Sequence, residues 1–456
     1  MPLHSLRAIA RHLSRAECEA IAKKVLGFSH ADECRVTISS GVRANTRFAQ
    51  NQISTAGDNY NNSVTIRAVF GKRVANVTTN RLDDASLKAA VENAERIARL
   101  APEDPELLPE LGPQSYDEPI VWNDGTASLE PEARADAVRA ITEPARRAGL
   151  ISTGYLEAQA QAFAIANSAG LFAYQRSTGV AFTTTVRTQD GTGSGWAGAS
   201  DNDFSRMDPR ALAARAIEKA QRSVNPVAIE PGRYTVVLEP TAAANLIQLI
   251  AGAVNARAAD EGRSFFSKAG GGNKIGEKVV DERVTLVSDP LDPRVPANTA
   301  GGDGLPSKRV NWIENGVVKN LAYDRFWAQR TGKAANSAGG TLAMQGGDSS
   351  VEDMIKSTER GLLVTRFWYI RPVDPRTILF TGLTRDGTFL IENGRVTRPV
   401  KNLRYNESPI FMLNNVMAMG RSERVSASEA GGPGQAISVP PMKVRDFTFT
   451  STSDAI

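Results

Sequence analysis

Apolar residues follow helical spacing in two segments near the start of the chain. The spacing predicts helices over 14–26 and 84–100, each with its apolar residues on one face. In the first helix, Ser14 and Glu17 have the spacing of a capping box, and Gly27 stands at the C-terminal end. Both segments therefore predict helices that pack on a neighbouring element through one face.

Alternation of apolar and polar residues predicts strands between and after these helices. In the first half, the predicted strands are 33–39, 64–70, 73–78 and short runs within 151–187. Two further helices are predicted at 128–148 and 209–223, the second with Asp208 as N-cap and Pro209 as its first residue. The first half therefore has the pattern of a mixed α/β region.

Most of the second half has the β-branched and aromatic composition of strands. The predicted strands are 234–238, 278–287, 310–323, 363–370 and 377–382. Asn315-Gly316 and Asn393-Gly394 each follow Ile-Glu and predict type I′ turns, which need positive φ at both residues. A single helix, predicted over 241–257, interrupts these strands.

Two segments without periodicity divide the chain. Residues 101–119 hold five prolines and six acidic residues but no basic one, which predicts an extended surface connection. Residues 224–232 contain two prolines and predict a boundary between domains at 1–225 and 226–456. The predicted fold class is α+β, with an N-terminal mixed α/β domain and a C-terminal domain rich in antiparallel strands.

Composition narrows the class of protein. Hydrophobic residues make up 41% and charged residues 23% of the 456 positions, as in soluble globular proteins. A net charge of +4 without a basic block argues against nucleic-acid and membrane binding. The most apolar stretch, 242–254, is shorter than the ~20 residues of a membrane span. With no signal-peptide core and no CxxC pair formed by Cys18 and Cys34, we expect a cytoplasmic protein with reduced, buried thiols.

Motifs that would identify a chemistry are few. The only histidines are three near the N-terminus, and no HExxH is present, which disfavours a metal site built on imidazoles. Asp201-Asn202-Asp203 opens like a calcium loop but lacks its later glycine and glutamate. A GxGxxG pattern at 193–198 precedes the next helix by about ten residues, too far for a dinucleotide site. The run 271–278 resembles a P-loop with Glu277 in place of the lysine.

Six short segments, in order along the chain, carry a family resemblance. They are TRFAQNQI at 46–53, SGWAGAS at 194–200, TGLTRDG at 381–387, LIENG at 390–394, RPVKN at 398–402, and GQ before VP at 434–440. Together they resemble the TldD/TldE (PmbA) family, known as modulators of DNA gyrase and as a zinc peptidase of two related subunits. The resemblance implies the two-domain fold of that family.

The zinc-bearing subunit of that family carries HExxxH on the helix after the first strand of the second half, and a cysteine near the C-terminus completes its site. Counting back from the SFFS segment at 264–267, the resemblance puts the motif on Ile247, Gln248 and Gly252. The cysteine position falls near 428–430, where no cysteine stands. Isoleucine and glycine offer a metal no lone pair, and glutamine is no base near neutral pH. We therefore predict a degenerate zinc site with no catalytic and no metal-binding residue in this chain.

The resemblance implies a non-catalytic, zinc-less subunit of a TldD/TldE-type metalloprotease, and it leaves undecided whether the chain alone is an enzyme. The expected partner is a TldD-like subunit that holds the zinc, in a hetero-oligomer, with homodimers open as well. The expected substrates are unfolded peptides, held by edge strands through main-chain hydrogen bonds. Two alternatives stay open: a hydrolase with a divergent active site of Asp and Glu ligands, and a regulatory binding protein that acts on DNA gyrase.

Overall fold

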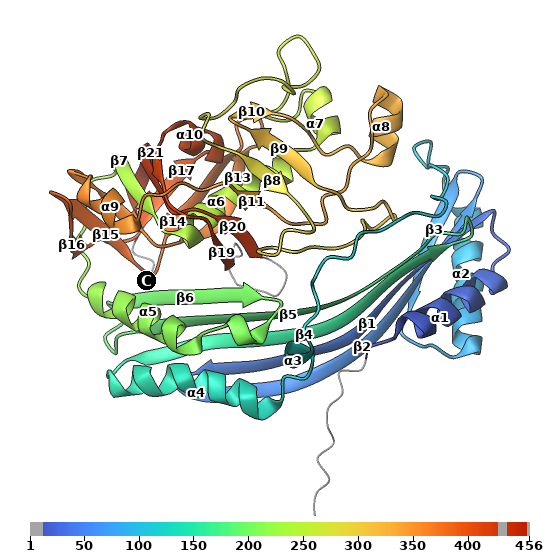
Figure 1. Cartoon of the computed structure of the whole chain (residues 1–456), viewed down its shortest axis with the longest axis horizontal. Coiled ribbons are helices and arrows are strands. Elements are labelled where there is room, and N and C mark those ends of the chain that lie inside the picture. Colours follow the sequence, from blue (N-terminus) through green and yellow to red (C-terminus); the bar gives the residue numbers. More distant parts are fainter. Residues whose placement is uncertain (1–11, 427–435, 454–456) are drawn as a thin grey trace, which may run out of the picture.

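The computed structural model describes residues 12–426 and 436–453, and its N-terminal half is built on one six-stranded antiparallel sheet (Figure 1). In the order β3-β2-β1-β4-β5-β6, each strand is antiparallel to its neighbours. The strands are β1 (Glu33–Ala49), β2 (Gln52–Phe70), β3 (Arg73–Thr79), β4 (Ile151–Asn167), β5 (Phe172–Arg187) and β6 (Ser194–Asp201). The helical elements are α1 (Arg15–Phe28), α2 (Asp84–Leu100), α3 (Asp124–Ala127), α4 (Pro131–Arg147), the 3₁₀ turn η1 (Phe204–Arg206) and α5 (Pro209–Arg222).

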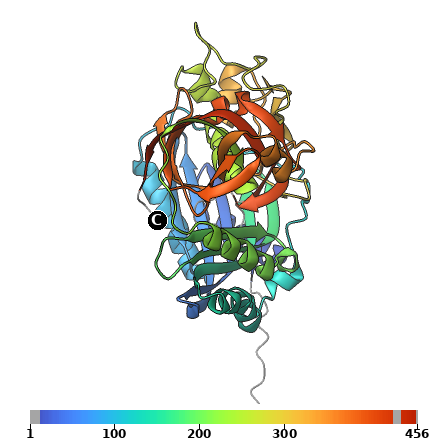
Figure 2. The same ribbon diagram turned by 90° about the vertical axis from the view of Figure 1, so that its left-hand side faces the viewer.

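The long strands bury alternate residues against helices on one face of this sheet. Val36 and Ile38 of β1 pack with α1 and α2, and Phe48, further along the same face, packs with α4 and α5. The opposite face carries Ile165 and Ala173, which pack against Ala300 of the C-terminal half. The sheet therefore lies between its own helices and the C-terminal half (Figures 1 and 2).

The described part of the C-terminal half contains two further sheets. The larger has the order β13-β14-β17-β21-β7-β12-β15-β16, and β18 also pairs with β21. Its strands are β7 (Gly232–Leu238), β12 (Arg360–Val364), β13 (Phe367–Asp374), β14 (Leu379–Thr384), β15 (Thr388–Glu392), β16 (Arg395–Pro399), β17 (Leu403–Glu407), β18 (Val416–Met419) and β21 (Met442–Thr452). The smaller sheet has the order β10-β9-β8-β11-β20-β19. Its strands are β8 (Leu286–Ser288), β9 (Val310–Glu314), β10 (Val317–Val318), β11 (Ala343–Met344), β19 (Glu423–Ser426) and β20 (Ala436–Val439).

The largest hydrophobic core of the described residues lies where these two sheets meet helix α6. The helices of this half are α6 (Pro240–Ala253), α7 (Ala256–Asp260), α8 (Arg325–Thr331), α9 (Val351–Lys356) and α10 (Pro409–Asn414). Figure 2 shows the orange and red strands curving around the yellow-green α6. The core therefore surrounds the helix on which the sequence places the degenerate metal motif.

Several sequence predictions are confirmed in detail. The predicted fold class, α+β with a C-terminal half rich in antiparallel strands, is confirmed. The capping box of Ser14 and Glu17 is formed at the start of α1. Asn315-Gly316 has φ values of 49° and 78°, and Asn393-Gly394 has 50° and 74°, as type I′ turns require.

Other predictions are corrected by the structure. The short strand-like runs at 151–187 are two long strands, because they pair with each other without a register shift from Ile151 and Arg187 to Ala166 and Phe172. The predicted strand 278–287 is reduced to Leu286–Ser288, since Asp281 instead accepts a hydrogen bond from Arg283 N and forms a turn. The helix predicted over 241–257 ends at Ala253, because Asn255 accepts from Ala258 N and begins the separate helix α7.

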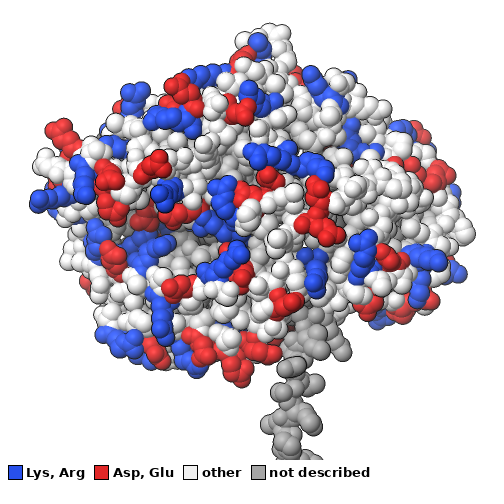
Figure 3. All heavy atoms as spheres, viewed as in Figure 1, with Lys and Arg blue, Asp and Glu red and all other residues white. Residues whose placement is uncertain are grey.

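Two surface observations complete the description. None of the helices in the described ranges combines the length and the apolar character that crossing a bilayer requires. On the face shown in Figure 3, basic and acidic side chains are interspersed, so that no large field of one sign covers this face.

Candidate functional site

Helix α6 begins where the first strand of the C-terminal half ends. Glu239 precedes the helix without a side-chain capping bond, and Pro240 is its first residue. The Glu239 carboxylate instead forms an ion pair with Lys219 of α5, with 2.6 Å between Nζ and Oε2. This mostly buried pair attaches the start of α6 to the N-terminal half.

The structure gives Ile247, Gln248 and Gly252 three different environments on α6. Ile247 is fully buried in the core around the helix. Gln248 is half-buried, and its Nε2 donates to Asn245 O at 3.4 Å. Gly252 is exposed, with open space where a Cβ would stand. Burial therefore falls along the motif, from the core at Ile247 to solvent at Gly252.

A groove with a volume of about 750 Å³ runs beside α6, and we call it the α6 groove. Gln248 lines it, whereas Ile247 and Gly252 do not. Its walls come from α6, β8, β9, β13, β20 and the segment before β11. They include Leu249, Ala251, Val254, Ser288, Trp312, Asn336, Ala338, Thr341, Leu342, Ile370, Arg371 and Ile437. The walls are thus mainly apolar, with the Gln248 amide and the exposed Arg371 guanidinium among the polar groups.

Most polar side chains in the wall are engaged with other protein groups. Trp312 Nε1 donates to Ser288 Oγ at 2.8 Å, and Ser288 Oγ donates to Thr341 O. Thr341 Oγ1 donates to Val295 O at 2.6 Å, and Asn336 Nδ2 donates to Leu321 O at 2.8 Å. This network fixes the shape of the groove, and its walls suit an extended apolar chain better than a charged one.

The residues of the α6 groove do not fit a zinc ion. Zinc in proteins is bound by thiolate, imidazole or carboxylate, and none of the described residues that line the groove carries any of these groups. Within 12–426 and 436–453, no cluster of three or more His, Cys, Asp or Glu side chains is placed to hold a metal. The predicted cysteine position at 428–430 lies outside the described residues.

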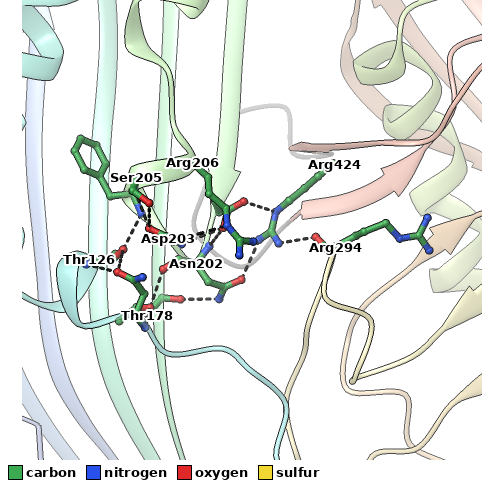
Figure 4. Close-up of polar contacts among 11 residues, drawn as sticks. Thr126, Thr178, Asn202, Asp203, Ser205, Arg206, Arg294 and Arg424 are labelled. Carbon is green, nitrogen blue, oxygen red and sulfur yellow. Dashed lines mark hydrogen bonds and ion pairs between the residues drawn. The ribbon is translucent and has the colours of Figure 1, made fainter.

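Arg424 of β19 connects the sheet beside the groove to the N-terminal sheet (Figure 4). Its Nε donates to Ser200 O at 2.8 Å, Nη2 to Asn202 Oδ1 at 3.1 Å, and Nη1 to Arg294 O at 2.6 Å. Asp201 adds a carboxylate 3.5 Å from Nε. Asp201 and Asn202, which open the run that resembles a calcium loop, thus contact Arg424 through their side chains.

Two of the family-like segments, 194–200 and 381–387, meet at another contact between the halves. Ser194 Oγ donates to Asp386 Oδ1 at 2.6 Å, and Asp386 Oδ2 lies 3.3 Å from Arg366 Nη1. The Arg366 guanidinium also faces the rings of Trp196 and Trp368, at 4.2 and 5.0 Å from their centroids. Ser194, Asp386, Arg366 and Trp196 are almost fully buried, and Ser194 and Asp386 also line a hollow of about 560 Å³ beside this contact.

The GxGxxG pattern at 193–198 has a packing role at the same place. A Cβ on Gly195 would lie 2.2 Å from Ala216 O, so only glycine lets β6 approach α5 this closely. The sequence indicated the segments that meet here but not the individual contacts of Lys219, Asp386 and Arg424. The partner of Lys219 lies 20 positions away, that of Asp386 lies 192 away, and those of Arg424 lie between 130 and 224 away, so no local sequence pattern predicts these contacts.

Comparisons with known proteins agree with this architecture. Three family models match: PmbA/TldA metallopeptidase domain 1 at 34–98, the central domain at 124–224, and the C-terminal domain at 231–451. A metalloprotease of Methanothermobacter thermautotrophicus is 24% identical over 75% of this chain and 79% of its own length. A TldD homologue of Buchnera aphidicola, also named a metalloprotease, is 26% identical over 42% of each chain.

A solved structure extends the similarity to the fold as a whole. TldE from Thermococcus kodakarensis superposes with a TM-score of 0.82 at 20% identity, over 95% of this chain and all of that one. The three family models together span most of the sequence, from residue 34 to residue 451. The chain therefore belongs to the PmbA/TldD metallopeptidase family.

Proposed function

We propose that this chain is the non-catalytic subunit of a TldD/TldE-type metalloprotease and that it pairs with a TldD-like, zinc-bearing subunit. The observation that carries the proposal is the donor set along α6. Where the resemblance places HExxxH, this chain has a buried isoleucine, a neutral amide and an exposed glycine. None of these groups binds zinc or takes a proton from water near neutral pH.

The α6 groove gives this subunit a role in holding substrate. Its volume of about 750 Å³ lies within the ~300–1,000 Å³ of typical ligand sites, and its walls are mainly apolar. An unfolded peptide presents apolar side chains and unpaired backbone groups together, which such a groove binds without reading a particular sequence. The partner subunit then supplies the zinc and the general base.

Peptide hydrolysis by each subunit and by their mixture tests this proposal. We expect this chain alone to leave unstructured peptides intact and the mixture to cleave them until a chelator removes the zinc. A matched control is a partner whose HExxxH glutamate is replaced by glutamine. This replacement should abolish peptide hydrolysis by the mixture. Chelator-resistant cleavage by this chain alone would instead support a hydrolase with a divergent site. If the partner hydrolyses peptides at the same rate with and without this chain, the result would support the alternative that this chain is a regulatory protein.

Elemental analysis provides a test that does not depend on activity. After purification without chelators, this chain should contain far less than one zinc per molecule, whereas the partner should contain about one. One tightly bound zinc per chain here would contradict the proposed role.

A further inference from the structure

The hollow beside Ser194 and Asp386 lies where the two halves of the chain are joined. Its volume of about 560 Å³ falls within the ~300–1,000 Å³ of typical small-molecule sites. Its walls come from the start of β6, the end of α5, the linker between α5 and β7, and the segments 386–388, 400–402 and 453. Figure 1 shows β6 and α5 of the N-terminal half below β15 and β16 of the C-terminal half, at the left of the view. We call this cavity the linker hollow.

One wall of the linker hollow is buried and holds unused hydrogen-bond donors. Asp386 and Thr388 are 5% and 2% exposed, and Gly387 between them is buried as well. The backbone N–H groups of Asp386 and Gly387 donate to none of the described residues. Thr388 Oγ1 likewise has no partner among them. Because more than nine in ten buried backbone N–H groups are paired, unused donors on three successive residues indicate a place for an acceptor.

The charge around these donors favours an anionic acceptor. The charged residues that line the hollow are Lys401 and Asp386. Arg366 Nη1 and Arg385 Nε lie 3.3 and 3.9 Å from Asp386 Oδ2, so the carboxylate is already neutralised. The exposed Asp190 accepts a hydrogen bond from another lining residue. Among the described side chains that line the hollow or bond to its lining, three are therefore positive and two negative, and an anion placed on the donors meets the excess positive charge.

Uncharged polar side chains make up most of the remaining wall. They are Thr192, Ser194, Ser223, Asn225, Asn402 and Ser453. Ser194 Oγ gives its proton to Asp386 Oδ1 at 2.6 Å and keeps lone pairs that can accept from a ligand. Asn225, with a φ of 51°, turns the linker at this wall. Hydroxyl and amide groups both donate and accept, so they match the hydroxyl groups of a ligand.

We propose that the linker hollow binds a small hydroxylated anion, of the class of sugar phosphates and polyhydroxy acids. Its phosphate or carboxylate accepts from the N–H groups of Asp386 and Gly387 and from Thr388 Oγ1, and Lys401 supplies the opposite charge. Its hydroxyl groups pair with the hydroxyl and amide side chains of the wall. None of the described residues of α6 lines this hollow, so the inference does not depend on the proposed function.

A ligand in the linker hollow contacts both halves at once. Ser194 and Ser223 belong to the N-terminal half, whereas the unused donors belong to the C-terminal half. The linker itself is tied to the C-terminal half, because Val227 N donates to Pro399 O and Lys401 N donates to Val227 O, both at 3.0 Å. Binding should therefore raise the Tm of the chain and slow hydrogen exchange at the amides of Val227 and Lys401.

Isothermal titration of the full chain with four probes tests the class of ligand. Glucose 6-phosphate and gluconate each combine an anionic group with hydroxyls, whereas glucose carries hydroxyls alone and inorganic phosphate is an anion alone. We expect at least one of the first two to bind with a Kd about tenfold or more below those of glucose and phosphate. The tighter of the two shows whether the anionic group is a phosphate or a carboxylate. Equal affinity for inorganic phosphate would indicate an adventitious ion only, and no binding of either hydroxylated anion would overturn the proposal.

Two variants and a control locate the binding. Thr388→Val removes a hydroxyl that bonds to no described residue, so it should leave the Tm of the free chain unchanged while raising the Kd by about five- to tenfold. Lys401→Met should raise the Kd by about tenfold or more, because the opposite charge is lost. The control Lys88→Met removes a lysine side chain that is 62% exposed on α2 and should leave the Kd unchanged.

Hydrogen exchange of the wild-type chain needs no variant, so it decides the question even if a variant fails to fold. With the tighter probe bound, exchange should slow at the amides of Val227 and Lys401 and stay the same along α6. A wild-type Kd for Thr388→Val and Lys401→Met would place the ligand elsewhere and overturn the proposal. Protection along α6 without protection of the linker would overturn it as well.

Discussion

Replacing Ile247 by aspartate tests the burial of the degenerate motif position. Ile247 has no exposed surface and lies within the largest core cluster. We expect Ile247→Asp to destabilise the chain strongly, whereas an aspartate at the zinc-ligand position of an open site would be tolerated. The substitution therefore separates a position absorbed into the core from one that still faces a cleft.

The magnitude follows from two contributions. Truncating a buried isoleucine costs about 2–5 kcal/mol in lost burial and residual cavity. An aspartate there also carries a carboxylate away from water without a partner, and an uncompensated buried charge costs about 3–5 kcal/mol. Because the group can take up a proton instead, we expect a total of about 5 kcal/mol. For a cooperative unit of 150–250 residues, this corresponds to a fall in Tm of about 10–20 °C.

Thermal and urea unfolding, followed by circular dichroism, measure the effect against two controls. Ala251→Asp puts the same charge on an exposed position of the same helix, near its C-terminal end, and should cost about 0.3–1 kcal/mol. Ile247→Val keeps the site apolar and should cost about 0.5–1.5 kcal/mol. If Ile247→Asp is no more destabilising than Ala251→Asp, the position is not buried and the reasoning about α6 is wrong.

Three further predictions concern other parts of the chain. Arg424→Met should increase hydrogen exchange at β19 and at the end of β6, because the bonds to Ser200 O and Asn202 Oδ1 are lost. Unchanged exchange would show that the Arg424 contact does not stabilise these strands. Burial raises the pKa of Cys18 and Cys34 to about 11, so both thiols should resist alkylation at pH 7.5 until urea unfolds the chain; rapid labelling of the folded protein would contradict their burial. Burial also raises the pKa of Glu407. The native state therefore binds the carboxyl proton of Glu407 more tightly than the unfolded chain does. The contribution of Glu407 to the free energy of unfolding should fall as pH rises from about 4.3 through the raised pKa. Glu407→Gln should remove this part of the pH dependence in urea unfolding, and an unchanged slope between pH 4 and 7 would show that Glu407 does not titrate with folding.

The sequence predicted local features well because their causes are local. The capping box at Ser14 and the two Asn-Gly turns depend on a few adjacent residues, and all three are found. The end of α6 was misplaced because Asn255 competes with the helix only through its own capping bond. A residue that ends one helix and starts the next interrupts no hydrophobic periodicity, so the spacing alone reads as one helix.

The sequence gives the residue types at the predicted motif positions but not the shape of the site around them. The absence of histidine from the second half follows directly from the sequence. The α6 groove does not, because its walls come from segments between Gln248 and Ile437 that approach only in the folded chain. The helix position that faces this groove also depends on how α6 is rotated in the core. Counting along a motif does not determine that rotation.

The contacts made by Arg424 have a consequence for motion. Rotating one half of the chain away from the other would remove the acceptors Ser200 O and Asn202 Oδ1 from Arg424, whereas its bond to Arg294 O lies within the C-terminal half. It would also separate Lys219 from Glu239 and Ser194 from Asp386. A hinge opens readily when few bonds cross it, and further polar connections cross this one, among them the ion pairs of Arg257 with Glu106 and of Lys308 with Asp117. The two halves should therefore tumble as a single body, and a peptide that enters the α6 groove must be admitted by loops at its rim or by a neighbouring subunit.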